Sequence, residues 1–337
     1  MTATIVDVSK NAGFLFAIVG RVVNGNYPVR DSTRERVNKA IEVLQYVPNL
    51  QARELNMQRS TTIGVVVPGL YNMFFAEVID GIEDNLRRGA YSLLLSCAQN
   101  DPQQEEECIN NLMSRNVSGI IVISPNTENI KTRFYDRTAR RLPMVFINSM
   151  SHVPNASYVS NDETAGARTA LRYLRGLGHE KILFVRGAKS DSYRVKEEAY
   201  RELMTEDGLF DERYVVNIGA GNSLHTVDTT MNLLMELLPD CEATAALCCN
   251  DLMGVGVLNA CKRLGIRVPE QMSIMGYDNT SLSRFVEPKL TTMDQNMLIL
   301  GSNAAELLIE KIETGRSKKV VLENILVPRE TTGPRRG

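Results

Sequence analysis

Three short helices are predicted in the stretch TIVDVSKNAGFLFAIVGRVVNGNYPVRDSTRERVNKAIEVL, residues 4–44. The first covers residues 4–12, because Thr4 can cap its start and Asp7 lies three residues later, the spacing of a capping box. Gly13 should then end this helix, since glycine adopts the left-handed backbone that stops a helix without steric strain. A short helix followed by a tight turn is therefore expected.

Two further helices complete the unit. The second, rich in apolar residues, is expected over residues 15–23. The third is predicted to begin at Ser32, with Glu35 at capping-box spacing, and to run to about Leu44. Two short helices joined by a tight turn and supported by a third predict a helix-turn-helix, a unit whose second helix enters the major groove of DNA.

The composition is that of an ordinary globular protein. Apolar residues make up 43% and charged residues 23% of 337 residues, which is too many for one core and predicts two or three domains. Neither a bilayer-spanning apolar run nor a signal peptide is recognised, so a cytoplasmic location without membrane association is expected. The cysteines and three histidines lack metal-binding spacing, so reduced core thiols are expected at Cys97, Cys108, Cys241, Cys248, Cys249 and Cys261.

Charge is distributed unevenly along the chain. Residues 1–60 contain eight basic and five acidic residues, a net charge of +3, whereas the remainder has 30 basic and 35 acidic residues. A small basic head joined to an acidic body is compatible with a nucleic-acid-binding module attached to a domain with another role. A charge of this size is weak support by itself.

Strands and helices alternate after residue 60. Short apolar runs predict buried parallel strands over residues 62–68, 92–96, 119–124, 144–148, 182–187, 245–249 and 273–277. Helices are expected between them, over residues 74–88, 103–116, 162–177, 194–207, 225–238 and 251–264. This alternation predicts an α/β core with doubly wound parallel sheets in two lobes, with ligands bound at the carboxyl ends of the strands, in the cleft between the lobes.

The chain resembles the lactose/galactose repressor (LacI/GalR) family of transcriptional regulators from residue 4 to about residue 332. In the head, the matching positions are Ile5, Asp7-Val8, Ala12-Gly13, Arg21-Val22, Asn24-Gly25, Thr33-Arg34, Val37, Ala40-Ile41, Tyr46, Pro48-Asn49, Ala52-Arg53 and Leu55. In the body they are Asn72–Glu83, Gly178-His179, Asn250-Asp251, Gly256, Gly276–Asn279, Leu290–Thr292, Gln295 and Arg329-Glu330. The resemblance implies a core similar to periplasmic sugar-binding proteins and a repressor controlled by a small effector.

Four parts of the chain follow from this resemblance. Residues 1–46 would be the helix-turn-helix domain and residues 47–60 a hinge helix or linker. The first lobe of the core would combine residues 61–160 with 290–320, including a helix. The second lobe would combine residues 161–289 with 321–333, including a last strand at 321–328.

The resemblance also implies which residues contact DNA. They are Thr4, Leu15, Phe16, Ile18, Gly20, Arg21, Asn24, Arg34, Asn49, Ala52, Arg53 and Leu55. Arg21 would contact a phosphate or a base edge, with a solvated arginine as the alternative. The hinge helix would fold only when two subunits sit on DNA, with Leu55 wedged into the minor groove.

The second helix departs from the family pattern. Leu15, Ile18 and Gly20 replace residues that are typically serine or threonine, and Phe16 is also expected to face outward. Apolar side chains can touch thymine methyl groups but cannot make the hydrogen bonds that discriminate between bases. Two functions therefore stay open: a ligand-responsive repressor with a palindromic operator, or a small-molecule binding protein with weakened DNA recognition.

Polar and aromatic residues near predicted strand ends are the candidates for effector binding. They are Phe74, Phe75, Asn148, Ser192, Lys196, Asn250, Asp278 and Gln295. Asp278 follows an apolar strand, and its carboxylate can accept hydrogen bonds from vicinal sugar hydroxyls. By resemblance, Lys196 takes the place of a ligand-pairing arginine. Phe74 and Phe75 could stack on a sugar ring.

The remaining expectations concern chemistry and partners. No nucleophile and base pair or phosphate-binding loop is recognised, so neither an enzyme nor a cofactor or metal is expected. The expected partners are double-stranded DNA, a sugar or sugar derivative, and a second copy of the chain. Catabolite-control members of the family bind a phosphorylated carrier protein on basic residues. Such a co-repressor is disfavoured here by the acidic residues Glu77, Asp80, Glu83, Asp84 and Glu287.

Overall fold

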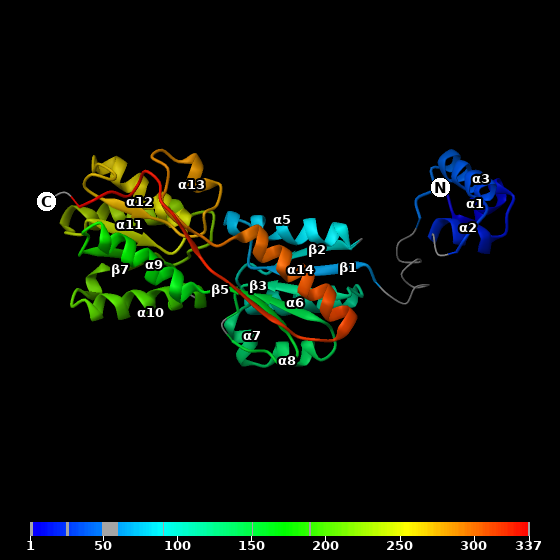
Figure 1. Ribbon diagram of the computed structural model, residues 1–337, viewed down its shortest axis with the longest axis horizontal. Coiled ribbons are helices and arrows are strands. Elements are labelled where there is room, and N and C mark those ends of the chain that lie inside the picture. Colours follow the sequence, from blue (N-terminus) through cyan, green and yellow to red (C-terminus); the bar gives the residue numbers. More distant parts are fainter. Residues whose placement is uncertain are drawn as a thin grey trace. The chain divides into compact units, whose positions relative to one another are not determined.

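The computed structural model describes residues 3–24, 27–48, 60–89, 91–149, 151–188 and 190–335. The chain divides into two compact units, Met1–Thr61 and Thr62–Gly337. Each unit is described by itself below (Figure 1). Within the described residues, no helix combines the length and the apolar character that a membrane crossing requires.

The first unit is a three-helix domain. It contains α1 (Ile5–Ala12), α2 (Phe16–Asn24) and α3 (Asp31–Leu44). Its small core is formed by Val8, Ala12, Val19, Val37 and Ala40. The core positions are four residues apart in α1 and three apart in α3, and α2 contributes Val19, so each helix buries one face.

The predicted ends of α1 are confirmed. The side chain of Thr4 caps the helix, and the side chain of Asp7 accepts a hydrogen bond from the Thr4 backbone at 2.9 Å. Gly13 ends it with a φ of +71°. The prediction for the third helix was wrong at its start: α3 begins at Asp31 after Arg30, and no side chain caps it. The backbone enters the helix one residue before the expected cap, which leaves Ser32 inside the first turn.

The first lobe of the second unit is built on a six-stranded parallel sheet in the order β11-β5-β4-β3-β1-β2. Its strands are β1 (Thr62–Val67), β2 (Ser92–Cys97), β3 (Gly119–Ile123), β4 (Met144–Ile147), β5 (Ser157–Asn161) and β11 (Lys319–Leu322). Its helices are α5 (Met73–Arg88), α6 (Pro102–Ser114), α7 (Thr127–Lys131), α8 (Phe134–Ala139) and α14 (Met297–Thr314). Branched apolar residues fill the strands, as expected for a sheet covered on both faces.

The second lobe contains a four-stranded parallel sheet in the order β7-β6-β8-β9. Its strands are β6 (Ile182–Arg186), β7 (Val215–Asn217), β8 (Ala245–Cys248) and β9 (Ser273–Met275). Its helices are α9 (Glu163–Gly176), α10 (Asp191–Glu206), α11 (Thr226–Leu237), α12 (Asp251–Leu264) and α13 (Leu282–Phe285), with short 3₁₀ turns at Glu212–Tyr214 and Leu238–Asp240. Between the lobes, β10 (Thr292–Asp294) pairs antiparallel with β12 (Ile325–Val327).

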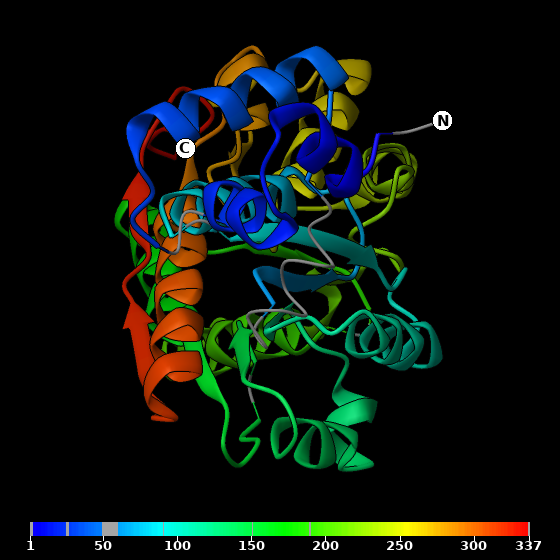
Figure 2. The same cartoon turned by 90° about the vertical axis from the view of Figure 1, so that its right-hand side faces the viewer.

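Helices α5 and α14 pack closely in the first lobe, as Figures 1 and 2 show. Glycine is required on both sides of this contact. A Cβ atom on Gly81 would lie 2.2 Å from the backbone oxygen of Leu298, and one on Gly301 would lie 2.1 Å from the backbone oxygen of Val78. The two backbones therefore approach at distances that exclude any side chain.

The predicted lobe boundaries need one correction. The run 321–328 was predicted as one strand of the second lobe, but β11 pairs with β5 in the sheet of the first lobe. Glu323 and Asn324 break the run, and only β12 continues beyond them to pair with β10. Two polar residues inside an apolar stretch thus mark the crossing between the lobes.

Candidate functional site

The candidate DNA-binding surface of the first unit is helix α2 and its flanks. The backbone oxygen of Leu15 accepts hydrogen bonds from Ile18 N at 2.9 Å and Val19 N at 3.2 Å. Leu15 thus occupies the N-cap position of α2, and its side chain has no oxygen that could accept a hydrogen bond from the first turn. Leu15 is 76% exposed and Phe16 is 56% exposed, so the outer face of this helix is apolar, as the sequence predicted.

The other predicted DNA contacts on the first unit are placed as follows. Ile18 and Gly20 are partly exposed, and a Cβ atom on Gly20 would meet no atom within 4 Å. Arg21 is exposed, and its guanidinium lies 5.3 Å from the centroid of the Tyr27 ring. Thr4 and Arg34 are exposed, and Asn24 ends α2. Four further predicted contacts lie outside the described residues: Asn49, Ala52, Arg53 and Leu55.

In the second unit, a cavity of about 1080 Å³ lies between the two lobes. It is lined by the residues that follow the strands of both sheets, which is where the fold predicted a ligand site. All eight predicted ligand residues lie on its wall: Phe74, Phe75, Asn148, Ser192, Lys196, Asn250, Asp278 and Gln295. The structure thus brings together residues separated by more than two hundred positions in the sequence.

Asp278 lies deep in this cavity. Gln295 Nε2 donates to its Oδ1 at 2.5 Å and Asn72 Nδ2 to its Oδ2 at 3.3 Å. Burial raises the pKa of Asp278 well above its ordinary value, and the nearby carboxylate of Asp251 raises it further. Both donors to Asp278 are neutral amides, so this carboxyl group has no cation within hydrogen-bonding distance.

Hydrogen bonds on both sides of Asp278 fix the loop that contains it. Its backbone has a φ of +118°, which side-chain-bearing residues rarely adopt. The carboxylate of Asp251 accepts hydrogen bonds from Thr280 N at 2.8 Å and Thr292 Oγ1 at 2.7 Å. Arg329 donates to Asn279 Oδ1 at 2.5 Å. The loop is thus fixed from both sides, and its unusual backbone keeps the carboxyl group directed at the cavity wall.

Lys196 and Ser192 are tied to a carboxylate that the sequence reasoning did not select. Ser192 Oγ donates to Glu163 Oε1 at 2.7 Å, and Lys196 Nζ lies 3.0 Å from Ser192 Oγ and 3.7 Å from Glu163 Oε1. Lys196 Nζ also lies 3.8 Å from the centroid of the Tyr277 ring. The ammonium group is therefore already engaged within the protein.

Asn250 and the two phenylalanines have structural roles alongside their place on the wall. Asn250 caps α12, and its Nδ2 donates to Gly221 O at 2.8 Å and Tyr193 Oη at 3.1 Å. Phe74 and Phe75 are 5% and 4% exposed and pack edge to face against each other. The predicted stacking on a sugar ring is therefore disfavoured, because the core covers most of both rings.

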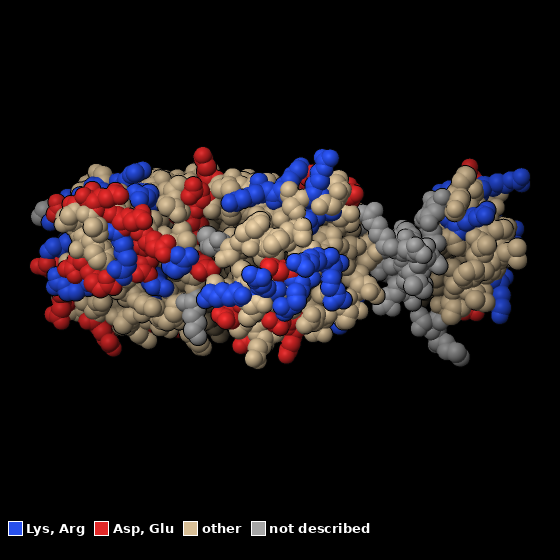
Figure 3. All heavy atoms as spheres, turned by 90° about the horizontal axis from the view of Figure 1, so that it is seen from below, with Lys and Arg blue, Asp and Glu red and all other residues tan. Residues whose placement is uncertain are grey.

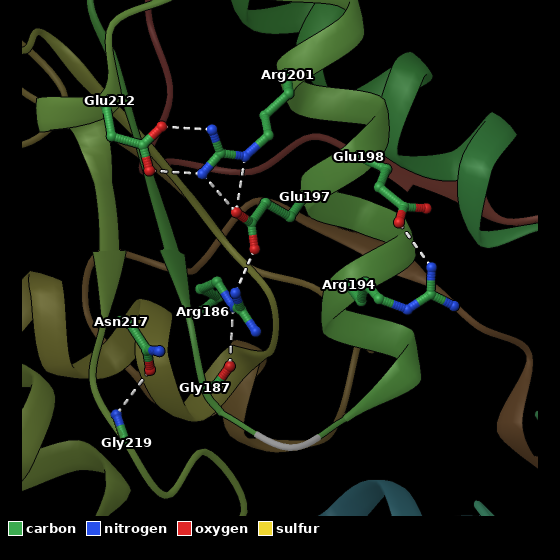
Figure 4. A network of polar contacts seen from close by, with 9 residues as sticks. All are labelled: Arg186, Gly187, Arg194, Glu197, Glu198, Arg201, Glu212, Asn217 and Gly219. Atoms are coloured by element: carbon green, nitrogen blue, oxygen red, sulfur yellow. Dashed lines mark hydrogen bonds and ion pairs between the residues drawn. The ribbon is translucent and has the colours of Figure 1, made fainter. Parts of the chain in front are cut away.

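Residues that the sequence reasoning missed include Asn72, Arg186, Glu163 and Asn222. Arg186 ends β6, so the strand-end rule could have found it. Figure 4 shows Arg186 paired with Glu197, which also bonds Arg201. Arg201 in turn pairs with Glu212. This ladder of alternating charges leads from the cavity wall toward the protein surface.

Hydrogen bonds join the two lobes around the cavity. Asn72 Nδ2 donates to Asn222 Oδ1 at 2.9 Å, and Thr127 Oγ1 donates to Asp191 Oδ2 at 2.6 Å. A third link joins Ser281 to Glu77 Oε1, with distances of 3.0 and 3.1 Å from its N and Oγ. The arrangement can bind a polar small molecule between the lobes.

Comparisons with known proteins agree with both units. Residues 4–49 match the family described as bacterial regulatory proteins, lacI family, and residues 171–332 match a periplasmic binding protein-like domain. The chain is 34% identical to catabolite control protein A of Priestia megaterium, over 98% of this chain and 100% of that protein. It is 32% identical to the HTH-type transcriptional repressor PurR of Vibrio atlanticus, over 95% of each chain.

Two solved structures resemble the whole chain. The lac repressor dimer bound to operator and the anti-inducer ONPF is 25% identical, with a TM-score of 0.85 and coverage of 99% of this chain and 100% of that chain. The complex of the transcriptional regulator CelR with cellobiose is 28% identical, with a TM-score of 0.71 and coverage of 98% and 99%. The expected fold class, a helix-turn-helix head on a periplasmic-binding-protein-like core, is confirmed.

Proposed function

This chain belongs to the lacI family of bacterial regulatory proteins, and we propose that it is a repressor that binds a palindromic operator as a homodimer under the control of a sugar or sugar derivative. It would act on DNA in the cytoplasm, with no chemical step and no cofactor. The first unit would contact the operator, and the effector would occupy the cavity of the second.

The cavity is the observation that carries the effector proposal. Its volume of about 1080 Å³ is large enough for a mono- or disaccharide. Its wall has acceptors and donors from both lobes, including Asp278, Asn148 and Gln295. A similar chain, CelR, is described in complex with cellobiose, which supports a sugar as the class of ligand.

The helix-turn-helix supports the operator proposal. Helix α2 packs one face on the small core through Val19 and leaves its outer face exposed, and the exposed Arg21 and Arg34 can contact phosphates. The lac repressor is described as a dimer on its operator. A two-fold symmetric operator fits two such heads, because each head reads one half-site.

The proposal is tested with two measurements on the full chain. A thermal-shift screen of sugars should find a compound that raises the melting temperature, since a ligand stabilises the state that binds it. A gel shift with genomic fragments should then find a fragment whose affinity changes when that sugar is added. If no sugar stabilises the protein and no fragment is retained selectively, the proposed function is wrong.

A second candidate function is supported by the apolar face of α2: a sugar-binding protein whose specific recognition of DNA is weakened. Phosphate contacts would survive, giving weak and salt-sensitive binding. The triple variant Leu15→Ser, Ile18→Thr and Gly20→Ser restores a helix cap and polar groups, and Gly20 has open space for a side chain.

The triple variant should bind a palindromic operator with a central CG step at least about tenfold tighter at equal salt, by fluorescence anisotropy. If the unmodified chain already binds that site at nanomolar concentration and rejects scrambled DNA, apolar readout suffices and the second candidate is wrong.

A phosphorylated carrier protein is not part of the proposal. Helix α5 contains Glu77, Asp80, Glu83 and Asp84, and this negative charge would repel a phosphate group. Addition of a phosphorylated carrier protein should therefore leave the operator affinity unchanged in the same gel shift.

A further inference from the structure

Carboxylates outnumber cations on the wall of the cavity. Six carboxyl groups line it: Asp101, Glu105, Glu128, Glu163, Asp191 and Asp278. Among the described residues of the wall, the cations are Arg186, Arg194 and Lys196. On the face seen in Figure 3 the two signs are mixed, with basic side chains gathered over the first lobe. The described part of the cavity wall thus has more carboxyl groups than cations.

Each of these three cations already has a carboxylate partner in the same chain, although the pair of Arg194 is half exposed. Arg186 pairs with Glu197, as Figure 4 shows. Arg194 pairs with Glu198 at 2.6 Å, and Asp191 lies 3.6 Å from it. An anionic ligand would have to compete with these partners for the positive charge.

Lys196 is likewise paired with a carboxylate of the protein. Its Nζ lies between Glu163, Ser192 and the ring of Tyr277, and the side chain is 3% exposed. The ion pair with Glu163 is buried on both sides, so taking Lys196 away from it would leave a carboxylate without compensation. Lys196 is thus poorly placed to donate hydrogen bonds to a phosphate or carboxylate ligand.

Several carboxyl groups, by contrast, are bonded only to neutral donors. Asp278 accepts from two side-chain amides. Glu105 accepts from Tyr135 Oη at 2.6 Å and Asn129 Nδ2 at 2.8 Å. Burial raises the pKa of both carboxyl groups, because loss of solvent disfavours their charged form.

Glu163 gives an independent indication of an unfilled position. Its Oε1 is engaged with Ser192 and Lys196, but its Oε2 is buried without a hydrogen-bond partner. Buried polar atoms are nearly always satisfied in native proteins, by the protein, by water or by a ligand. A donor placed by a ligand in the cavity would satisfy this oxygen.

From these contacts we infer that the effector is a polyol with a protonated amine, of the amino sugar class, and that anionic sugars such as sugar phosphates are excluded. The inference rests on the proposed function, since it specifies the charge of the ligand in the same cavity. The ammonium group would donate charge-assisted hydrogen bonds toward Glu163 and Asp278, which are stronger than those of a hydroxyl group. A phosphate in the same place would be repelled by the carboxylates of the wall.

The test compares a neutral, a cationic and an anionic form of the same sugar. Glucose, glucosamine and glucose 6-phosphate, and the matching galactose and mannose sets, are titrated into the full chain by calorimetry at pH 7. For the scaffold that binds, the amine should bind at least about tenfold tighter than the neutral sugar, and the phosphate more weakly than either. Equal or tighter binding of the neutral sugar or of the phosphate overturns the inference and leaves the proposed function standing. Binding of none of these compounds overturns the inference, and the sugar screen and the gel shift described above then decide the proposed function.

A charge-removal variant sharpens this test. Glu163→Gln keeps the shape of the side chain but releases Lys196 from its carboxylate partner, so the preference should reverse: the amine loses at least about tenfold and inorganic phosphate gains measurable affinity. Glu236→Gln, at an exposed position of α11, is the matched control and should change neither affinity. An unchanged preference for the amine in folded Glu163→Gln would overturn the role of Glu163.

A second variant covers the case in which Glu163→Gln does not fold. Lys196→Met keeps a flexible side chain of similar volume against Tyr277 and removes the positive charge, which leaves Glu163 without its partner. The amine should then raise the melting temperature more than it does for the unmodified chain, because it supplies the missing cation. A smaller rise than in the unmodified chain counts against the inference.

Discussion

Replacing Asp278 by asparagine should make the protein more stable while weakening effector binding. The carboxyl group of Asp278 is 3% exposed and lies near that of Asp251, whose pKa burial raises to about 7. The asparagine side chain has nearly the same shape and no charge, and asparagine tolerates a positive φ better than most residues. The variant therefore removes a buried charge without creating a cavity.

The raised pKa values determine whether stability rises or falls with pH. A folded-state pKa above the unfolded value means that the folded state holds its proton longer, so stability falls as pH rises from the unfolded pKa through the folded one. For Asp251, with a folded pKa of about 7 and an unfolded value near 3.9, this loss is roughly 4 kcal/mol, spread from about pH 4 to about pH 7. Asp278 adds a loss of the same sign, because burial raises its pKa as well.

Asp278→Asn should therefore gain ~1–4 kcal/mol of unfolding free energy at pH 8, the range seen when buried charges are replaced by groups of similar volume. At pH 5 the gain should be smaller, because the raised pKa of Asp278 leaves a larger fraction of the carboxyl group uncharged at lower pH. The measurement is urea unfolding at both values, with the exposed Asp240→Asn as the control. Affinity for the tightest sugar of the screen should fall at least about tenfold, since each charge-assisted hydrogen bond contributes ~1.5–3 kcal/mol.

Opposite shifts of stability and affinity distinguish a binding residue from a structural one. If Asp278→Asn destabilises the protein equally at both pH values, the carboxylate serves mainly to anchor Gln295 and Asn72. If the sugar binds unchanged, Asp278 does not contact it. Either result would refute the reasoning.

Two further predictions concern packing and assembly. Gly301→Ala should destabilise the core by ~1–3 kcal/mol or more in urea unfolding, because its Cβ would lie 2.1 Å from the backbone oxygen of Val78. Gly176→Ala has no atom within 4 Å of its Cβ and should be neutral; a loss as large as that of Gly301→Ala would contradict the packing argument. The core alone, starting near Thr61, should sediment as a dimer, and a monomer at micromolar concentration would contradict the proposed homodimer.

The start and the end of α1 could be predicted from the sequence, because capping depends only on residues that are neighbours in the chain. The capping box of Thr4 and Asp7 and the end of α1 at Gly13 need no knowledge of distant contacts. The failed capping box at Ser32 shows the limit of this reasoning, since several polar residues near Asp31 could start the helix and only the packed backbone decides among them.

Positions in the cavity were predictable, but their partners were not. Residues at the ends of parallel strands meet at one edge of a sheet, so Asp278 and Asn250 could be placed there from the sequence. The contact of Lys196 with Glu163 depends on how α9 and α10 pack, 33 positions apart in the sequence. No spacing rule connects two residues on different helices, and for this reason the engagement of Lys196 was missed.

The same polar groups join the lobes and line the cavity, which links ligand binding to lobe closure. Asn72 belongs to the first lobe and donates both to Asn222 and to Asp278 of the second. A ligand that donates to Asp278 and also contacts wall residues of the first lobe adds contacts that exist together only while the lobes stay together. Such a ligand shifts the equilibrium toward the closed arrangement. The size of this shift is limited by the difference between the ligand's affinities for the closed and the open arrangement.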